Sequence, residues 1–276
     1  MSRLLFVGVA LALVGCATPS RQTENLLRAP PQDIPVAVQL DHVPFVAQAE
    51  GYCGPATLTM AMQAAGQNVS VEQLGPEVFT PGNKGSLQLD LISASRRHGM
   101  LAIPIENLTA LLREVASGHP VIVFENLGLS WYPRWHYAIV TGYDLGTQDI
   151  ILHSGPKQFS REDMYRFEYA WKLAGYWALV ILPPGELSTT ANELAHVAAA
   201  AGLEQAGKLI EAQQAYHNIL RRWPGSFSSL IGLGNVTYRT GDAQSAAKYL
   251  RQAVKLNPES TVARHNLEVA EKSLKK

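Results

Sequence analysis

The stretch Gln48-Ala49-Glu50-Gly51-Tyr52-Cys53-Gly54-Pro55-Ala56 decides the fold of the first part of this chain. Pro55 suits the first turn of a helix, and Gly66 suits its end. Between them, apolar residues recur at helical spacing: Leu58, Ala61, Met62 and Ala65. Cys53 is therefore predicted to lie at a helix N-terminus, where the positive end of the helix lowers the pKa of a thiol. This makes Cys53 our candidate nucleophile.

The chain downstream of this helix carries further helix signals and then strand signals. Residues 86–97 and 109–117 predict helices, and four apolar, β-branched runs predict strands: 121–124, 136–143, 149–153 and 176–182. Helices followed by sequential strands predict an α+β domain with an antiparallel sheet, which we place at residues 35–184.

Three blocks of sequence carry a family resemblance when they are taken together with Gln48. They are Cys53-Gly54-Pro55-Ala56, Gly118-His119-Pro120-Val121-Ile122-Val123 and His136-Tyr137-Ala138-Ile139-Val140-Thr141-Gly142-Tyr143-Asp144. Residues 38–182 thereby resemble the papain-like peptidases that cut bacteriocin leaders, family thirty-nine of the cysteine peptidases. The resemblance implies a papain-like fold, a peptide or protein substrate, and hydrolysis by thiol acyl transfer.

The same resemblance implies roles for three side chains. Cys53 would attack the peptide carbonyl and His136 would move the proton. Gln48 would bind the oxyanion together with the backbone N–H of Cys53. We expect no cofactor, and the remaining histidines show no spacing typical of a zinc site.

One residue of the family pattern is missing. The family places an aspartate at the end of the strand after the catalytic histidine, to orient the imidazole. Here the matching position is Ser154, with His153 beside it as the alternative if the register slips by one. Asp149 begins that strand, about 15 Å away at about 3.3 Å per residue, and is an improbable substitute.

Trp131, Tyr132 and Trp135 precede His136. These aromatic residues either wall a substrate cleft or cap the core, and the sequence alone favours neither.

The N-terminus resembles a bacterial lipoprotein signal. Arg3 precedes the apolar run Leu4 to Val14, which is too short for the roughly 20 residues of a membrane span, and Cys16 follows at the expected cleavage site. The resemblance implies lipidation of Cys16 and, because no aspartate follows it, attachment to the outer membrane facing the periplasm. Residues 1–16 would be the signal, and the proline-rich residues 17–34 an extended tether.

The C-terminal residues 185–276 repeat with a period of 34: Gly207 matches Gly241, Ala212 matches Ala246, and Pro224 matches Pro258. This spacing resembles the tetratricopeptide repeat, and implies an all-α module of about two repeats plus a final helix over 261–274 that docks a protein partner. So small an array is expected to lean on the preceding domain through residues 195–200.

Composition narrows the possible functions. The chain of 276 residues balances 23 Lys and Arg against 23 Asp and Glu, so a nucleic-acid partner is not expected. The sequence predicts a lipid-anchored envelope cysteine peptidase with a docking module. Two alternatives remain open: a transpeptidase of the same fold, and a catalytically degenerate scaffold that binds peptides or envelope proteins.

Overall fold

The computed structural model describes residues 20–275 except residues 50 and 84. Cys16 and the predicted signal at residues 1–16 therefore lie outside the described residues. Within the described part, no helix combines the length and the apolar character needed to cross a membrane.

The described residues form one seven-stranded antiparallel sheet with the order β4-β9-β5-β6-β7-β8, and β1 pairs with β6 off this path. Its strands are β1 Ala37–Gln39, β4 Leu101–Pro104, β5 Val121–Asn126, β6 Trp135–Asp144, β7 Asp149–Ser154, β8 Lys157–Asp163 and β9 Ala178–Leu182. A separate two-stranded sheet pairs β2 Phe79–Thr80 with β3 Gly85–Ser86.

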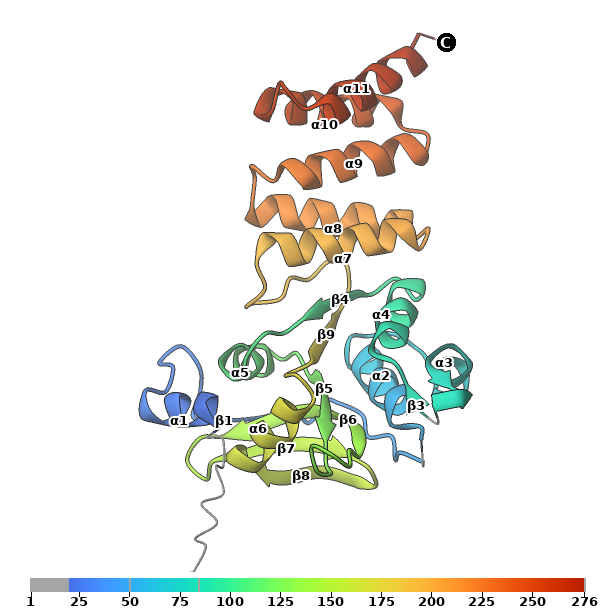
Figure 1. The fold of residues 1–276 in the computed structure, drawn as a ribbon. Coiled ribbons are helices and arrows are strands. Elements are labelled where there is room, and N and C mark those ends of the chain that lie inside the picture. The colour runs from blue at the N-terminus through green and yellow to red at the C-terminus, as the bar shows by residue number, and fades with distance from the viewer. Residues whose placement is uncertain (1–19, 50, 84, 276) are drawn as a thin grey trace, which may run out of the picture.

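Helices cover this sheet (Figure 1). They are α1 Arg21–Arg28, α2 Cys53–Ala64, α3 Val71–Val78, α4 Gln88–Arg97, α5 Leu108–Ala116 and α6 Met164–Leu173, with a short 3-10 turn η1 Pro81–Asn83. The predicted α+β domain with an antiparallel sheet is confirmed. The strict order of helices before strands is not, because β4 precedes α5 and α6 follows β8.

The C-terminal part is all-helical, as predicted. Its helices are α7 Glu193–Gln205, α8 Leu209–Arg222, α9 Phe227–Arg239, α10 Ala243–Leu256 and α11 Thr261–Ser273. Gly207 and Gly241, one repeat apart, join successive helices with φ of +77° and +91°, a left-handed conformation that favours glycine. The helices stack in succession away from the sheet (Figure 1). We call residues 193–273 the helical module.

The helical module shares its core with the α+β domain. Strands β4 and β9 extend toward α7 (Figure 1), and α7 packs against β4. Ala199 and Ala200 of α7 are buried in the same hydrophobic cluster as Ile103 of β4. The predicted contact through residues 195–200 is confirmed by this packing, and the alanine side chains are small enough to leave room for the strand.

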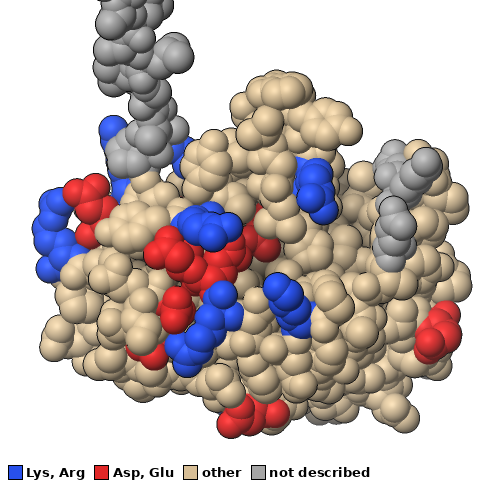
Figure 2. Space-filling view, turned by 90° about the horizontal axis from the view of Figure 1, so that it is seen from below, with Lys and Arg blue, Asp and Glu red and all other residues tan. Residues whose placement is uncertain are grey.

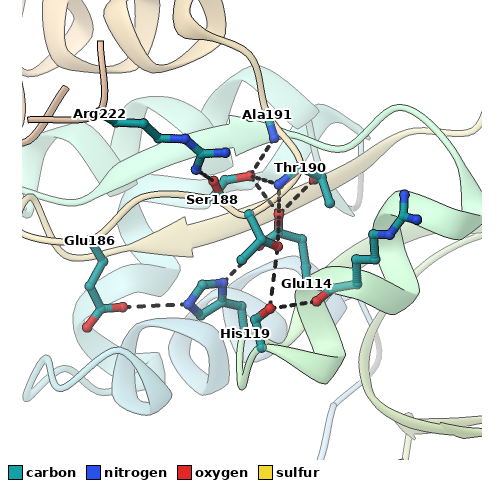
Figure 3. A network of polar contacts seen from close by, with 10 residues as sticks. Glu114, His119, Glu186, Ser188, Thr190, Ala191 and Arg222 are labelled. Carbon is teal, nitrogen blue, oxygen red and sulfur yellow. Dashed lines mark hydrogen bonds and ion pairs between the residues drawn. The ribbon is translucent and has the colours of Figure 1, made fainter. Parts of the chain in front are cut away.

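A buried carboxylate holds the segment between the two parts (Figure 3). Glu114 of α5 is fully buried, and its Oε1 accepts hydrogen bonds from the hydroxyls of Ser188 and Thr190 at 2.6 and 2.7 Å and from Thr190 N–H at 2.9 Å. His119 Nδ1 lies 2.8 Å from the other carboxylate oxygen, and Arg222 of α8 donates to the carbonyl of Ser188. We call these residues the Glu114 junction.

Burial alone would raise the pKa of Glu114, but hydrogen bonds from His119, Ser188 and Thr190 lower it to about 2. Glu114 is therefore ionised at neutral pH although no solvent reaches it, and the Glu114 junction is a fully satisfied polar network.

The predicted tether at residues 17–34 is wrong for its central part. Residues 21–28 form α1, whose Leu26 enters the core. Glu168 of α6 accepts hydrogen bonds from the N–H groups of Gln22 and Thr23 at the start of α1, at 3.1 and 2.6 Å. Free N–H groups at a helix start favour a carboxylate partner, and this one comes from a distant part of the sequence, where a local pattern could not indicate it.

Charged residues of both signs are intermingled on the face below the sheet (Figure 2). Arg161 of β8 pairs with Asp144 and Asp149 at 3.5 and 3.2 Å. This face shows no large patch of a single sign.

Candidate active site

Cys53 and His136 lie in the same cleft, which has a volume of about 830 Å³. Cys53 begins α2 as predicted, and the residue before it, Tyr52, provides no side-chain cap. Gln48, Ser86 and Tyr137 line the same cleft. The structure thus brings three residues predicted from the sequence, Gln48, Cys53 and His136, to one place.

Two glycines shape the backbone around Cys53. Gly51 has φ of +77°, which lets the chain turn sharply into α2. A Cβ at Gly54 would lie 2.3 Å from Ser86 Oγ, so only glycine permits the contact between the start of α2 and β3. These two positions explain why glycine flanks the thiol.

The resting thiol of Cys53 differs from the expected thiolate. Burial raises the pKa of Cys53 above its ordinary value, although hydrogen bonds from the backbone N–H groups of Tyr137, Gly54 and Cys53 itself act in the opposite direction. These hydrogen bonds therefore do not outweigh desolvation, and the prediction of a lowered pKa is wrong for the resting site.

His136 is neutral at physiological pH. Burial, with a smaller contribution from the positive charge of Arg134, lowers the pKa of His136 to about 4. Its Nε2 lies 2.9 Å from Ser154 Oγ. This leaves Nδ1 as the nitrogen that is free to exchange a proton with a reacting group, and a hydrogen bond from Nε2–H to Ser154 would select the tautomer with that free lone pair.

His153 is engaged elsewhere. Its Nε2 lies 3.2 Å from the carbonyl oxygen of Val43, and its Nδ1 accepts a hydrogen bond from Phe159 N–H at 3.1 Å. The ring is fully buried. The structure therefore pairs His136 with Ser154 and not with His153, whose contacts hold the loop at Val43 against the sheet.

Gln48 bridges the nucleophile turn to the sheet. Its Nε2 donates to the carbonyl of Tyr137 at 3.2 Å, and its Oε1 accepts from Gly155 N–H at 3.1 Å. One of the two N–H groups of the side-chain amide remains available to an oxyanion in the cleft.

The aromatic residues before His136 divide into two groups. Trp135 stacks on Phe124 at 5.2 Å, and both line the cleft. Trp131 and Tyr132 are 78% and 68% exposed and lie outside that lining. The core-cap interpretation is therefore wrong for Trp131 and Tyr132, and the cleft-wall interpretation fits Trp135.

Two features of the site were not predicted from the sequence. The backbone of Tyr137 contacts both Cys53 and Gln48, a role that no side-chain pattern indicates. Glu125 is a buried carboxyl in β5, and its only sequence signal is a charged residue directly after the apolar run 121–124. Among the described side chains, no group of three or more His, Cys, Asp or Glu is arranged to hold a metal ion.

Comparison with known proteins places the domain in a family. Residues 31–179 match the model of the Peptidase_C39 like family. No curated protein matches the chain.

Two crystal structures are similar to this chain. One is a candidate C39-like peptidase from Bacillus anthracis, with 20% identity, a TM-score of 0.46, and coverage of 55% of this chain and 99% of that one. The other is the peptidase domain of Streptococcus ComA, a bi-functional ABC transporter involved in a quorum sensing pathway, with 22% identity, a TM-score of 0.41, and coverage of 51% and 99%. Since the family model spans more than half of the chain, the protein belongs to the Peptidase_C39 like family.

Proposed function

We propose that this protein is a cysteine peptidase that hydrolyses a peptide bond by thiol acyl transfer. The observation that carries the proposal is the meeting of Cys53, at the start of α2, with His136 and Gln48 in one cleft. Membership of the Peptidase_C39 like family supports it.

The neutral state of both groups favours a general-base mechanism. His136 takes the thiol proton as the Cys53 sulfur forms a bond to the substrate carbonyl carbon, and the carbonyl oxygen becomes an oxyanion. The backbone N–H of Cys53 and the amide of Gln48 donate to that oxyanion. The imidazolium then protonates the leaving amine as the C–N bond breaks.

The acyl-enzyme is resolved by water. His136 removes a proton from the water as its oxygen attacks the thioester carbon. The bond to Cys53 then breaks, the thiol recovers its proton from His136, and the acid product leaves. An amine in place of water would give transpeptidation by the same residues, so the nature of the acceptor distinguishes the two reactions.

The proposal also covers where the enzyme is attached and what its helical module binds. Cys16, by its lipoprotein-like signal, would anchor the chain to the outer membrane facing the periplasm. The helical module, with a 34-residue period typical of tetratricopeptide repeats, would dock a protein substrate or partner. Membrane fractionation of the wild type and of Cys16→Ala tests the anchor, which requires release of the variant from the membrane fraction.

One observation favours the scaffold alternative. His136 has Ser154 as its partner where the resembled family carries an aspartate, so no carboxylate of the described residues hydrogen-bonds to the imidazole. A degenerate site of this kind would bind peptides in the cleft without cutting them.

Incubation with a diverse peptide library decides between these functions. We expect new peptide termini with the wild type and none with Cys53→Ala, measured by mass spectrometry. Joined peptides in place of hydrolysed ones would indicate a transpeptidase. Unchanged peptides with folded wild-type protein would contradict the enzyme and favour the scaffold.

A further inference from the structure

Glu125 is a buried carboxyl that the proposed mechanism does not use. It lies in β5 with 1% of its surface exposed, and its Oε1 has no hydrogen-bond partner among the residues that the structure describes. A buried carboxyl oxygen without a hydrogen-bond partner destabilises the folded state, so it lowers the free energy of unfolding. Such a group in the strand beside the candidate active site calls for an explanation.

The sheet register places Glu125 beside the candidate base. Glu125 of β5 pairs directly with His136 of β6, and no bulge interrupts this part of the ladder. Side chains of directly opposed residues in an antiparallel pair project from the same face of the sheet, with Cβ atoms about 5 Å apart. The side chains of Glu125 and His136 therefore project from adjacent positions on one face of the sheet.

The surrounding charges decide when Glu125 is ionised. Burial, and to a lesser extent the carboxyl of Glu162 on β8, raise the pKa of Glu125 to about 8. Arg166 and Asp163, at the start of α6, act on Glu162. On β6, Arg134 lowers the pKa of His136. Glu125 is thus neutral at pH 7 and acquires its charge at mildly alkaline pH.

We propose that Glu125 is a positioning residue for His136, whose carboxylate supplies from β5 the negative charge that Ser154 cannot supply from β7. The assignment rests on the proposed role of His136 as the base. When Glu125 has lost its proton to solvent, its charge stabilises the imidazolium that forms as His136 takes the thiol proton. A neutral Glu125 gives no such stabilisation.

The first test is a titration that does not depend on turnover. The full chain carries Cys53→Ala, which removes the only cysteine of the described residues, and labelled histidine, and the ring signals of His136 are followed by NMR. We expect one step near pH 4 and a second near pH 8, where Glu125 ionises. Glu125→Gln should lose the second step. Glu162→Gln should move it to lower pH, because it removes the like charge.

The second test is the pH profile of kcat/KM for a cleaved peptide. The ratio of wild type to Glu125→Gln should be near one at pH 6 and rise to about tenfold above pH 8, as expected for a charge worth one pKa unit on the imidazolium. A flat ratio would show that the carboxyl is only structural and would overturn the positioning role.

The outcomes separate this inference from the proposed function. A second NMR step that is absent, or that persists in Glu125→Gln, overturns the inference whatever the activity. Should Glu125→Gln fail to fold, an unmoved step in Glu162→Gln overturns it. If no peptide is cleaved although the NMR steps behave as expected, the peptidase proposal fails while the coupling of Glu125 to His136 stands.

Discussion

Two buried glutamates of this protein have opposite ionisation states. Glu114, in the Glu114 junction, accepts hydrogen bonds at both carboxylate oxygens, and its pKa falls to about 2. Glu125, beside the candidate active site, has one oxygen that no described residue hydrogen-bonds, and its pKa rises to about 8. Burial opposes the charged form of both carboxyl groups. The number of hydrogen-bond donors to each carboxylate therefore decides whether its pKa falls or rises.

The contrast distinguishes buried polar groups that stabilise the fold from buried polar groups that serve the candidate active site. At the Glu114 junction every part of the carboxylate is satisfied, which stabilises one arrangement of the chain. Burial favours the neutral forms of Cys53 and His136 in the cleft and of Glu125 in the strand beside it. Groups whose pKa is shifted from the ordinary value are typical of sites that react, and the following substitutions test this division.

The largest expected effect is the loss of kcat when a residue of the cleft is replaced. His136→Ala should lower kcat for a cleaved peptide by about 10³-fold or more, because the general base is lost, with little change in the free energy of unfolding. His119→Ala, in the Glu114 junction, is the matched control. It should reduce stability and leave kcat near the wild-type value. Equal losses of kcat in both variants would contradict the division.

Glu114→Gln should destabilise the protein by about 3 kcal/mol at pH 7, since its pKa falls from 4.5 to about 2 on folding. A carboxylate with a lowered pKa stabilises the fold fully above pH 4.5, and this stabilisation is lost as the pH falls toward 2. The difference in the free energy of unfolding between wild type and variant should shrink over that range. Denaturant titrations at several pH values measure it, and a difference independent of pH would show that the charge is irrelevant.

Ser154→Asp should restore the carboxylate of the resembled family. The added charge should raise the pKa of His136 from about 4 and favour the thiolate–imidazolium pair, so alkylation of Cys53 by iodoacetamide at pH 7 should become about tenfold faster. Ser154→Asn, which is similar in size and uncharged, is the control. If both variants react at the wild-type rate, the hydrogen bond between His136 and residue 154 does not tune the site.

The smallest expected effect concerns the cleft wall. Trp135 is 53% exposed and stacks on Phe124, so Trp135→Ala should change the free energy of unfolding by less than about 1 kcal/mol. KM for a peptide should rise several-fold with kcat nearly unchanged, because substrate binding is weakened uniformly. Trp131→Ala, outside the cleft lining, is the control and should leave KM unaltered.

Much of the fold was predictable because its signals are local. Pro55 and Gly66 frame α2, and the glycines at a spacing of 34 mark turns between helices of the helical module. The placement of Cys53, His136 and Gln48 in one cleft also agrees with the family blocks.

The remaining features depend on contacts between distant residues. α1 is held by Glu168, more than a hundred residues away, so its sequence alone suggested a tether. The raised pKa of the Cys53 thiol reflects burial by the whole domain, which the position of a helix start does not reveal. Glu125 becomes relevant only through the register that sets it opposite His136.

The Glu114 junction limits how far the helical module can move relative to the cleft. A flexible connection would spread a docked polypeptide over many positions and dilute its effective concentration at any one of them. Here Ser188 and Thr190 are fixed to α5 through a single carboxylate, and α7 shares the core of the sheet. The start of the helical module is therefore held against the domain that carries Cys53, and a polypeptide docked as we propose would lie at a nearly constant distance from the cleft.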